Sequence, residues 1–282
     1  MKMLSYWKAI VTVINCGIIV VHAADFDDLF QASWAPDHIV VQGAQIALSL
    51  DSSTGCGFES KNKYLFGKAS AQLKLVEGDS AGTVTAFYMA SEGPNRDELD
   101  FEFLGNVSGE PYVVQTNLYI NGTGNREQRH YLWFDPPRIS IPTPSSGTNE
   151  QSYDIPIREF PNKEKKGVAY PRSQAMGVHG SLWNADDWAT QGGRVTTNWS
   201  HSPFVVEFQS FEIDACQLSP DGADDPVVKC GKSGQFWWDK PVVKEVNKQR
   251  KRQLKWIRDN FLIYDYCQDV ARFTEGMLRE CL

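Results

Sequence analysis

The sequence predicts an all-β protein: a β-sandwich with one concave sheet, followed by a short C-terminal extension that contains a helix. Three observations support this fold class. Short alternating or apolar runs, separated by Gly, Asn, Asp and Pro, recur from about residue 26 to residue 215 with little helical period. One run, 97–106, alternates acidic and apolar residues. After Cys216 the composition changes, and 244–258 has the pattern of a basic amphipathic helix.

The N-terminal segment 1–23 has the features of a secretory signal peptide. Lys2 and Lys8 flank its start, residues 9–21 are mostly apolar, and small residues precede a cleavage site after Ala23. The apolar run is short for a membrane span, so an anchor is the less favoured interpretation. We expect a secreted mature chain that begins near Ala24 and does not associate with a membrane.

Individual elements follow from local patterns. The runs 39–41, 45–50, 71–75 and 204–208 have the apolar or alternating pattern of short strands. A chain of 282 residues is long enough for one large β-domain or two modest domains. We place the sandwich at 24–215 and the extension at 216–282.

The run 97–106 is the strongest functional signal. Glu98, Asp100 and Glu102 alternate with Leu99, Phe101 and Phe103, which predicts a strand with one acidic face and one apolar face. Three like charges on one strand face repel one another, so folding alone gives no reason for them. A solvated edge strand is the alternative, but such a strand has little use for an apolar second face.

Retaining glycoside hydrolysis needs two carboxyl groups roughly 5–5.5 Å apart. The Cα atoms of Glu98 and Glu102 lie about 13 Å apart along a strand, and two Glu side chains that lean together close most of that gap. We assign Glu98 as the nucleophile, Asp100 as its helper and Glu102 as the acid/base. Crowded carboxylates raise at least one pKa, as the proton donor requires. A calcium or magnesium site is the weaker alternative, and we expect neither metal nor cofactor.

Charge and composition restrict the partners. The formal net charge is −7, hydrophobic residues make up 41% and aromatic residues 12% of the chain. This charge disfavours nucleic acid and anionic membranes. A neutral polysaccharide is compatible with it.

The cysteines indicate an oxidising compartment. Cys16 leaves with the signal segment, Cys56 is expected to be a buried thiol, and four cysteines cluster near the C-terminus. These four are Cys216, Cys230, Cys267 and Cys281. Local pairing, 216 with 230 and 267 with 281, is the simplest of three possible connectivities. Each bridge would contribute on the order of 3 kcal/mol.

The segment Glu98-Leu99-Asp100-Phe101-Glu102 matches the E-x-D-x-E strand of the family 16 glycoside hydrolases. With its flanks, the chain resembles the xyloglucan endotransglucosylase/hydrolases of plant cell walls. The similarity extends over 64–68, 80–88, 115–117, 125–128, 181–190, 256–261 and 264–267. It implies a jelly roll, the local disulfide pairing, a xyloglucan donor, and a xyloglucan or oligosaccharide acceptor. A xyloglucan-specific endo-hydrolase is the alternative enzyme, and we expect a monomer.

The resemblance also implies the site residues. Those expected to line the cleft are Gln115, Thr116, Asn117, Asn125, Arg126 and Glu127. Those expected to meet the acceptor are Asp187, Trp188, Gly192, Tyr264 and Arg272. Trp183 and Trp188 flank two acids, a mixture that suits stacking on sugar rings. Of the sequons at Asn106, Asn121 and Asn198, the first matches the family's glycan position.

The resemblance stops between Pro136 and Pro156. Relatives have a core strand pair here that begins T-K-D-F-H-T-Y-S-I-L-W-N, whereas residues 137–149 contain three prolines and predict a loop. One allowed back-translation of 137–149, read two bases later, gives K-D-F-H-T-Y-S-I-L-W-N-E. We therefore hypothesise a change of reading frame that is restored before Asp154, which sequencing of the transcript tests. A sandwich without that strand pair is the basis of a third alternative, a catalytically impaired glucan-binding protein.

Overall fold

The computed structural model describes residues 25–132, 139–142, 155–219, 222–231, 236 and 248–282, with 139–142 described as backbone only. The predicted signal segment 1–23 lies outside these ranges. The first residues of the predicted helix, 244–247, lie outside them too, as does most of the segment 137–153. Among the described residues, no helix is long and apolar enough to cross a bilayer.

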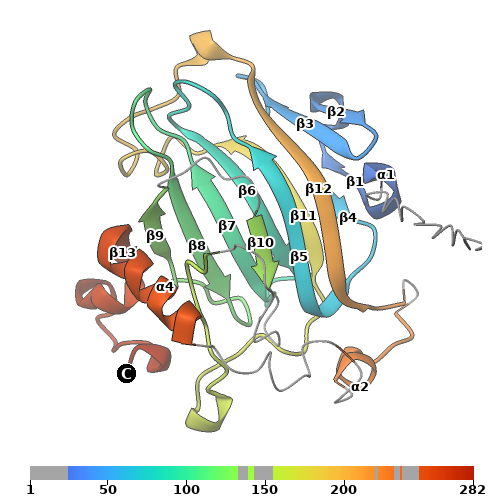
Figure 1. Ribbon diagram of the computed structural model, residues 1–282, viewed down its shortest axis with the longest axis vertical. Coiled ribbons are helices and arrows are strands. Elements are labelled where there is room, and N and C mark those ends of the chain that lie inside the picture. The colour runs from blue at the N-terminus through green and yellow to red at the C-terminus, as the bar shows by residue number, and fades with distance from the viewer. Residues whose placement is uncertain (1–24, 133–138, 143–154, 220–221, 232–235, 237–247) are drawn as a thin grey trace, which may run out of the picture.

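Two antiparallel sheets form a sandwich (Figure 1). The eight-stranded sheet has the order β1-β4-β11-β6-β7-β8-β9-β13 and the five-stranded sheet the order β10-β5-β12-β3-β2. The strands are β1 Phe30–Trp34, β2 Ile39–Gln42, β3 Gln45–Leu50, β4 Cys56–Ser60, β5 Tyr64–Lys74, β6 Thr83–Ala90, β7 Glu98–Leu104, β8 Val113–Tyr119, β9 Gln128–Tyr131, β10 Ile139–Pro142, β11 Gly177–Asn184, β12 Phe204–Gln217 and β13 Leu262–Asp265. The predicted all-β sandwich is confirmed, and each of the four predicted runs lies in a strand or extends one residue beyond it.

Helices are few and short in the described chain. They are α1 Phe26–Leu29, α2 Pro226–Cys230 and α4 Lys248–Asn260. Single 3-10 turns occupy Pro36–His38, Glu164–Lys166, Trp199–His201, Tyr266–Gln268, Val270–Arg272 and Arg279–Cys281. The predicted C-terminal helix is confirmed in α4.

The core lies between the sheets and is rich in phenylalanine. Phe58 of β4 is fully buried and contacts the rings of Phe30, Phe208 and Phe211 at centroid distances of 5.1, 5.3 and 5.7 Å. The apolar face of β7 points into this core: Phe103 is 2% exposed and Leu99 is also buried. Because side chains alternate along a strand, the carboxylates of β7 must point to the opposite face of the sheet.

Part of the segment in which the family resemblance stops forms a strand, so the prediction of a loop is wrong for residues 139–142. β10 pairs with 68–71 of β5, from Ile139 opposite Ala71 to Pro142 opposite Lys68. It is the edge strand of its sheet among the described residues. An edge position tolerates proline because no further strand needs its missing N–H group.

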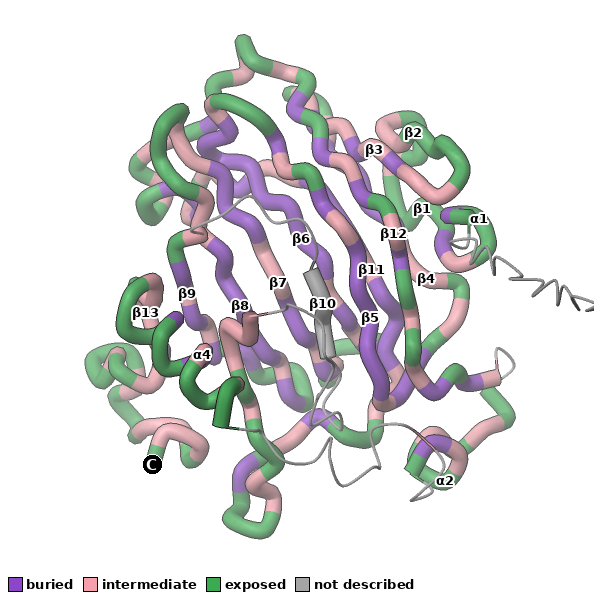
Figure 2. The backbone as a smooth tube through the Cα atoms, viewed as in Figure 1, coloured by how far each residue is buried: buried purple, intermediate pink, exposed green. Residues whose placement is uncertain are grey.

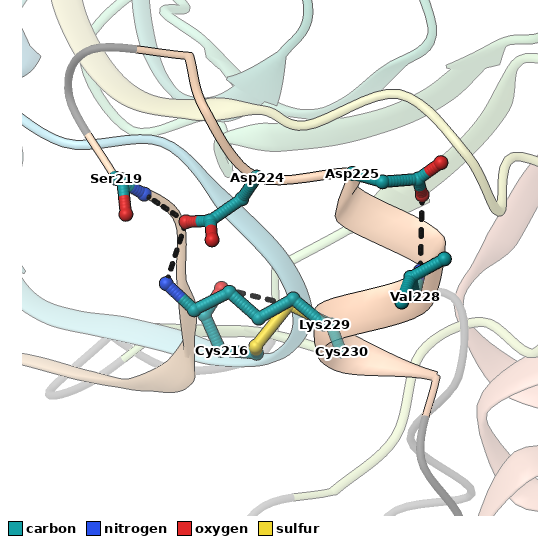
Figure 3. Close-up of a disulfide and its surroundings, with 7 residues drawn as sticks. All are labelled: Cys216, Ser219, Asp224, Asp225, Val228, Lys229 and Cys230. Atoms are coloured by element: carbon teal, nitrogen blue, oxygen red, sulfur yellow. Dashed lines mark hydrogen bonds and ion pairs between the residues drawn. A yellow bond between two sulfur atoms is a disulfide. The ribbon is translucent and has the colours of Figure 1, made fainter.

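The C-terminal extension contains two disulfides, Cys216–Cys230 and Cys267–Cys281, as predicted. Figure 3 shows the first bridge. Beside it, Asp224 accepts hydrogen bonds from Ser219 N at 2.6 Å and Lys229 Nζ at 2.7 Å. Cys56 is a buried free thiol, also as predicted.

The extension also widens the eight-stranded sheet. β13 pairs antiparallel with β9 and becomes the last strand beyond β8 and β9. The outer face of this sheet therefore continues from the sandwich into the extension.

Candidate active site

A groove of about 750 Å³ crosses the outer face of the eight-stranded sheet. Its side chains come from strands β1, β6, β7, β8 and β11, from the turns that precede β7 and β9, from β9 itself, and from the loop after β11. The lining residues are Trp34, Ala86, Tyr88, Arg96, Glu98, Asp100, Glu102, Gln115, Asn117, Tyr119, Glu127, Arg129, Ser181, Trp183 and Trp188.

The three carboxylates of β7 all line this groove, as the period-2 pattern predicts. Asp100 lies between the other two and is 8% exposed. Burial, reinforced by the charges of Glu98 and Glu102 beside it, raises the pKa of Asp100 well above its usual range. Asp100 also hydrogen-bonds Glu98. A protonated Asp100 can donate that hydrogen bond and hold the Glu98 carboxylate in place.

Glu98 has a cation on its other side. Arg96 Nε forms an ion pair with Glu98 Oε2, and the Arg96 guanidinium lies 5.2 Å from the centroid of the Tyr119 ring. Tyr119 stands directly opposite Glu98 in the pairing of β7 with β8. Glu98 is thus positioned between Arg96 and Asp100, the carboxyl group whose pKa is raised.

Glu102 is held by a chain of two hydrogen bonds. Gln115 Nε2 donates to Glu102 Oε2 at 2.6 Å, and Arg129 Nε donates to Gln115 Oε1 at 2.6 Å. Arg129 therefore fixes the amide orientation of Gln115. Burial raises the pKa of Glu102, and the hydrogen bond from Gln115 opposes this shift without cancelling it. The raised pKa of Glu102 therefore suits it to carry a proton.

Aromatic rings border the carboxylates. The rings of Trp183 and Trp188 have centroids 6.0 Å apart. Tyr88 stacks on His179 at 4.8 Å. Trp34 lies against Gly57, where an added Cβ would approach its ring to 2.0 Å. Such rings present flat apolar faces to a sugar polymer, and their distribution extends the groove well beyond the carboxylates.

The predicted cleft residues divide into two groups. Gln115, Asn117, Glu127 and Trp188 line the groove. The side chain of Thr116 does not, because it follows Gln115 on the strand and faces the opposite side. Its hydroxyl accepts a hydrogen bond from Arg158 Nη1 at 3.0 Å. The prediction that Thr116 lines the cleft is wrong for its side chain.

Arg126 is also placed away from the groove, contrary to prediction. Its buried side chain pairs with Glu280 at 2.6 Å and donates to the carbonyl oxygen of Thr123 at 2.6 Å. Arg126 alternates with Glu127, which lines the groove. It fastens the C-terminal extension to the turn before β9.

Arg272, Tyr264 and Asn125 form a latch beside the groove. Arg272 donates to both Glu127 oxygens at 2.7 and 3.0 Å and to Asn125 Oδ1 at 2.8 Å. It also donates to the Tyr264 hydroxyl at 3.0 Å, and that hydroxyl donates to Asp269 at 2.9 Å. None of the three latch residues belongs to the groove lining. The latch joins the extension to Glu127, so it positions a residue of the groove.

Two predicted acceptor residues stand in the loop after β11, outside the groove lining. Asp187 is exposed, and Gly192 has φ +70° with open space around its Cα. Their contact with an acceptor stays a prediction. The predicted glycan position, Asn106, also stays one: its Nδ2 donates to Pro111 O at 3.1 Å.

Sequence reasoning missed several groove residues. Tyr88, Arg96, Tyr119 and Arg129 each lie two residues from another groove residue on the same or an adjoining segment. The same alternation that singled out the β7 carboxylates could have found them. Trp34 gives no such signal, because β1 joins the groove only through sheet pairing with β4. Among the described residues, no group of three His, Cys, Asp or Glu is placed to hold a metal ion.

Known proteins resemble this chain over nearly its whole length. Residues 26–138 and 153–201 match the profile of glycosyl hydrolases family 16, and residues 232–281 match that of the xyloglucan endo-transglycosylase C-terminus. The break at 139–152 falls in the segment where the motifs stop.

Xyloglucan endotransglucosylase/hydrolase protein 9 of Arabidopsis thaliana is 54% identical over 96% of this chain and 93% of its own length. Xyloglucan endotransglucosylase protein 6 of Diospyros kaki is 54% identical over 89% of this chain and 87% of its own.

Among solved structures, the apo Crh5 transglycosylase superposes with a TM-score of 0.50 at 21% identity. That match covers 68% of this chain and 81% of the other, and it shows the fold alone. On its sequence matches, the chain belongs to glycosyl hydrolase family 16 and carries the C-terminal region of the xyloglucan endo-transglycosylases.

Proposed function

We propose that this protein is a xyloglucan endotransglucosylase that cleaves a β-1,4-glucan backbone with retention and joins the fragment to a second xyloglucan chain. One observation carries the proposal: three carboxyl groups from a single strand line one groove, with buried Asp100 between two glutamates. The names of the two relatives support the choice of substrate.

In the first step, Glu98 attacks the anomeric carbon and Glu102 protonates the departing glucan oxygen. Arg96 and Asp100 hold the Glu98 carboxylate, while the raised pKa of Glu102 favours its protonated form. The bond from anomeric carbon to bridging oxygen breaks as the ester to Glu98 forms. The reducing-end fragment leaves with the proton from Glu102.

In the second step, Glu102 is a carboxylate and acts as a base. It takes the proton of an acceptor hydroxyl, whose oxygen displaces Glu98 from the anomeric carbon. Water in place of the acceptor gives hydrolysis. Gln115 and Arg129 stabilise the charged form of Glu102 that this step requires.

Transfer requires that the acceptor bind before water reacts. The extension supports such binding by adding β13 to the sheet and by holding Glu127 through Arg272. We place the acceptor on this side of the groove, with Trp188, Asp187 and Gly192 across from it. The opposite side, with Trp34 and Tyr88, would hold the donor.

We place the protein in the cell wall, as a secreted monomer with residues 1–23 removed. The two disulfides support an oxidising compartment. The proposed partners are a xyloglucan donor and a xyloglucan or oligosaccharide acceptor.

The test is turnover of xyloglucan by the purified full chain, with labelled xyloglucan oligosaccharide as acceptor. Glu98→Gln should lower incorporation of label by at least roughly 10³-fold and leave glucan binding intact. Glu110→Gln, which changes an exposed acid outside the groove, is the matched control and should retain full activity.

Two results would contradict the proposal in different ways. Release of reducing ends without incorporation of label would make the protein a xyloglucan-specific hydrolase. Binding without either product would make it the catalytically impaired glucan-binding protein.

A further inference from the structure

Helix α4 concentrates positive charge in an acidic protein. Its thirteen residues, Lys248–Asn260, include six lysines and arginines and one acid, Asp259. The whole chain has a formal net charge of −7. Six positive charges and one negative charge give α4 a net charge of +5, so the rest of the molecule is still more acidic than the whole.

Five of these cations form a continuous surface, which we call the basic stripe. It consists of Lys248, Lys251, Arg252, Lys255 and Arg258, all exposed. Lys251 and Arg252 are adjacent, and the other successive members are three residues apart, about 4.5 Å along the axis, which puts all five on one side of the helix. Leu254 and Ile257 are buried and point toward the protein body.

Folding gives no reason for this arrangement. Like charges three and four residues apart on a helix repel one another and destabilise it. Lys255 pairs with Asp259 at 2.7 Å, but Lys248, Lys251, Arg252 and Arg258 have no ion-pair partner in the part of the chain that the structure describes. Within the described residues, the basic stripe therefore carries positive charge that is largely left without acidic partners.

The stripe lies away from the catalytic groove. Gln115 and Arg129 are paired in β8 and β9 and face the groove, whereas the next pair, Val114 and His130, faces the opposite side. Arg258 lies close enough to His130 to lower its pKa. Figure 1 shows α4 on the same side of β8 and β9 as the five-stranded sheet. A partner on the stripe would leave the groove open.

We propose that the basic stripe binds an acidic polysaccharide, a linear polymer of uronic acids. Such a chain carries one carboxylate per sugar, a spacing close to that of the stripe. Trp256 is 43% exposed and follows Arg252 by one turn, so a sugar ring can stack beside the cations. The enzyme would then be retained on an anionic polymer while its groove works on a neutral one.

Two other polyanions fit less well. A membrane-binding helix inserts its apolar side into the lipid, but the apolar side of α4 is buried in the protein. Nucleic acid is not expected in the oxidising compartment that the two disulfides indicate.

The experiment measures binding of the full chain to immobilised polygalacturonate at low and at physiological ionic strength. Lys248→Gln/Lys251→Gln/Lys255→Gln should lower the apparent affinity by about tenfold or more at low salt. Lys163→Gln/Lys165→Gln/Lys166→Gln removes equal charge from another basic segment and should change it by less than about twofold. Fully methyl-esterified pectin, the same backbone without charge, should not bind.

Both variants should keep wild-type activity on soluble xyloglucan, which separates this proposal from that for the groove. Equal affinity of the stripe variant and wild type for polygalacturonate would overturn it. So would stronger binding of the wild type to phosphatidylserine vesicles than to polygalacturonate. Equal affinity of the wild type for polygalacturonate at low and at physiological ionic strength would also overturn it. This measurement needs no variant.

Discussion

The two ends of the eight-stranded sheet are supported in different ways. At one end β4, β11 and β6 pack on β3, β12 and β5, with interlocked phenylalanines between them. At the other end β8, β9 and β13 are accompanied by the exposed helix α4. Figure 2 shows this contrast: β5, β6 and β11 are mostly buried, while α4 and β13 are mostly exposed or intermediate. We call these the sandwich end and the extension end.

Polar side chains are buried at the extension end. Nitrogen atoms of the Arg158 guanidinium are buried there, and the group donates to Thr116 and lies 5.6 Å from the Tyr266 ring centroid. Fully buried His130 has no hydrogen-bond partner for either ring nitrogen in the described chain. Such groups cost free energy that apolar packing would not.

The sandwich end and the extension end contribute differently to stability and to catalysis. β7 lies where the two ends meet, so its apolar face belongs to the strong core and its acidic face to the groove. The acceptor side of the groove is held instead by individual hydrogen bonds, ion pairs and a disulfide. The largest losses of stability should therefore come from the sandwich end, and changes at the extension end should act mainly on the acceptor side.

The largest expected effect is at Phe58, which contacts four other rings. Phe58→Ala should lower the free energy of unfolding by about 3–5 kcal/mol, because it removes the ring and leaves a cavity. Leu254→Ala, which removes an anchor of α4, should cost about 2 kcal/mol, at the low end for such changes. Chemical denaturation measures both, and equal losses would end the distinction between the two ends.

The second disulfide tests how the extension is held. Cys267→Ser/Cys281→Ser should lower stability by about 3 kcal/mol if the whole chain unfolds together, as the loop-entropy estimate gives. We also expect a higher KM for the acceptor with the donor KM unchanged, because Arg272 lies in the loop that this bridge closes. Matched losses for donor and acceptor would contradict the role of the extension.

A smaller effect is expected at His130 and should depend on pH. Burial, with the charges of Arg158 and Arg258, lowers the pKa of His130 to about 4, against about 6.5 in an unfolded chain. The unfolded state therefore binds more protons between these values, and stability falls as pH falls from about 6.5 to 4. His130→Leu should remove this contribution, on the order of 1–3 kcal/mol at pH 4.

Urea titrations of wild type and His130→Leu at pH 7 and at pH 4 measure the difference. The wild type should lose more stability than the variant between the two pH values. If the wild type and the variant lose equal stability between pH 7 and pH 4, His130 is charged or hydrated in the folded protein.

The smallest effect is expected at the surface of α4. Asp259→Ala breaks an exposed i, i+4 ion pair with Lys255 and should change stability by less than about 0.5 kcal/mol. Thermal unfolding at two salt concentrations measures it. A loss above 1 kcal/mol would show that α4 depends on this pair and that the extension end is held electrostatically.

Much of the fold could be predicted because its signals are local. The alternation of acidic and apolar residues in 97–104 predicts the strand, its buried face and the shared direction of its three carboxylates. The clustered cysteines favoured local pairing. The strand 139–142 could not be predicted, since its place depends on pairing with Lys68–Ala71, distant in the sequence.

Alternation of side chains along β7 predicts the three carboxylates of the groove. The groove residues on other strands were missed because the same argument was not applied to them. The family resemblance implies that Thr116 and Arg126 line the cleft, yet each alternates with a residue that lines the groove. Arg272 illustrates the remaining limit: its partners Asn125 and Glu127 lie more than 140 residues away.

The amino-acid order alone determined which carboxylates point together, because side chains of a strand alternate whatever surrounds it. Only the tertiary structure decided what holds them. Gln115 and Arg129 reach Glu102 through strand pairing, and the burial that raises the pKa of Asp100 exists only once the sheets have packed.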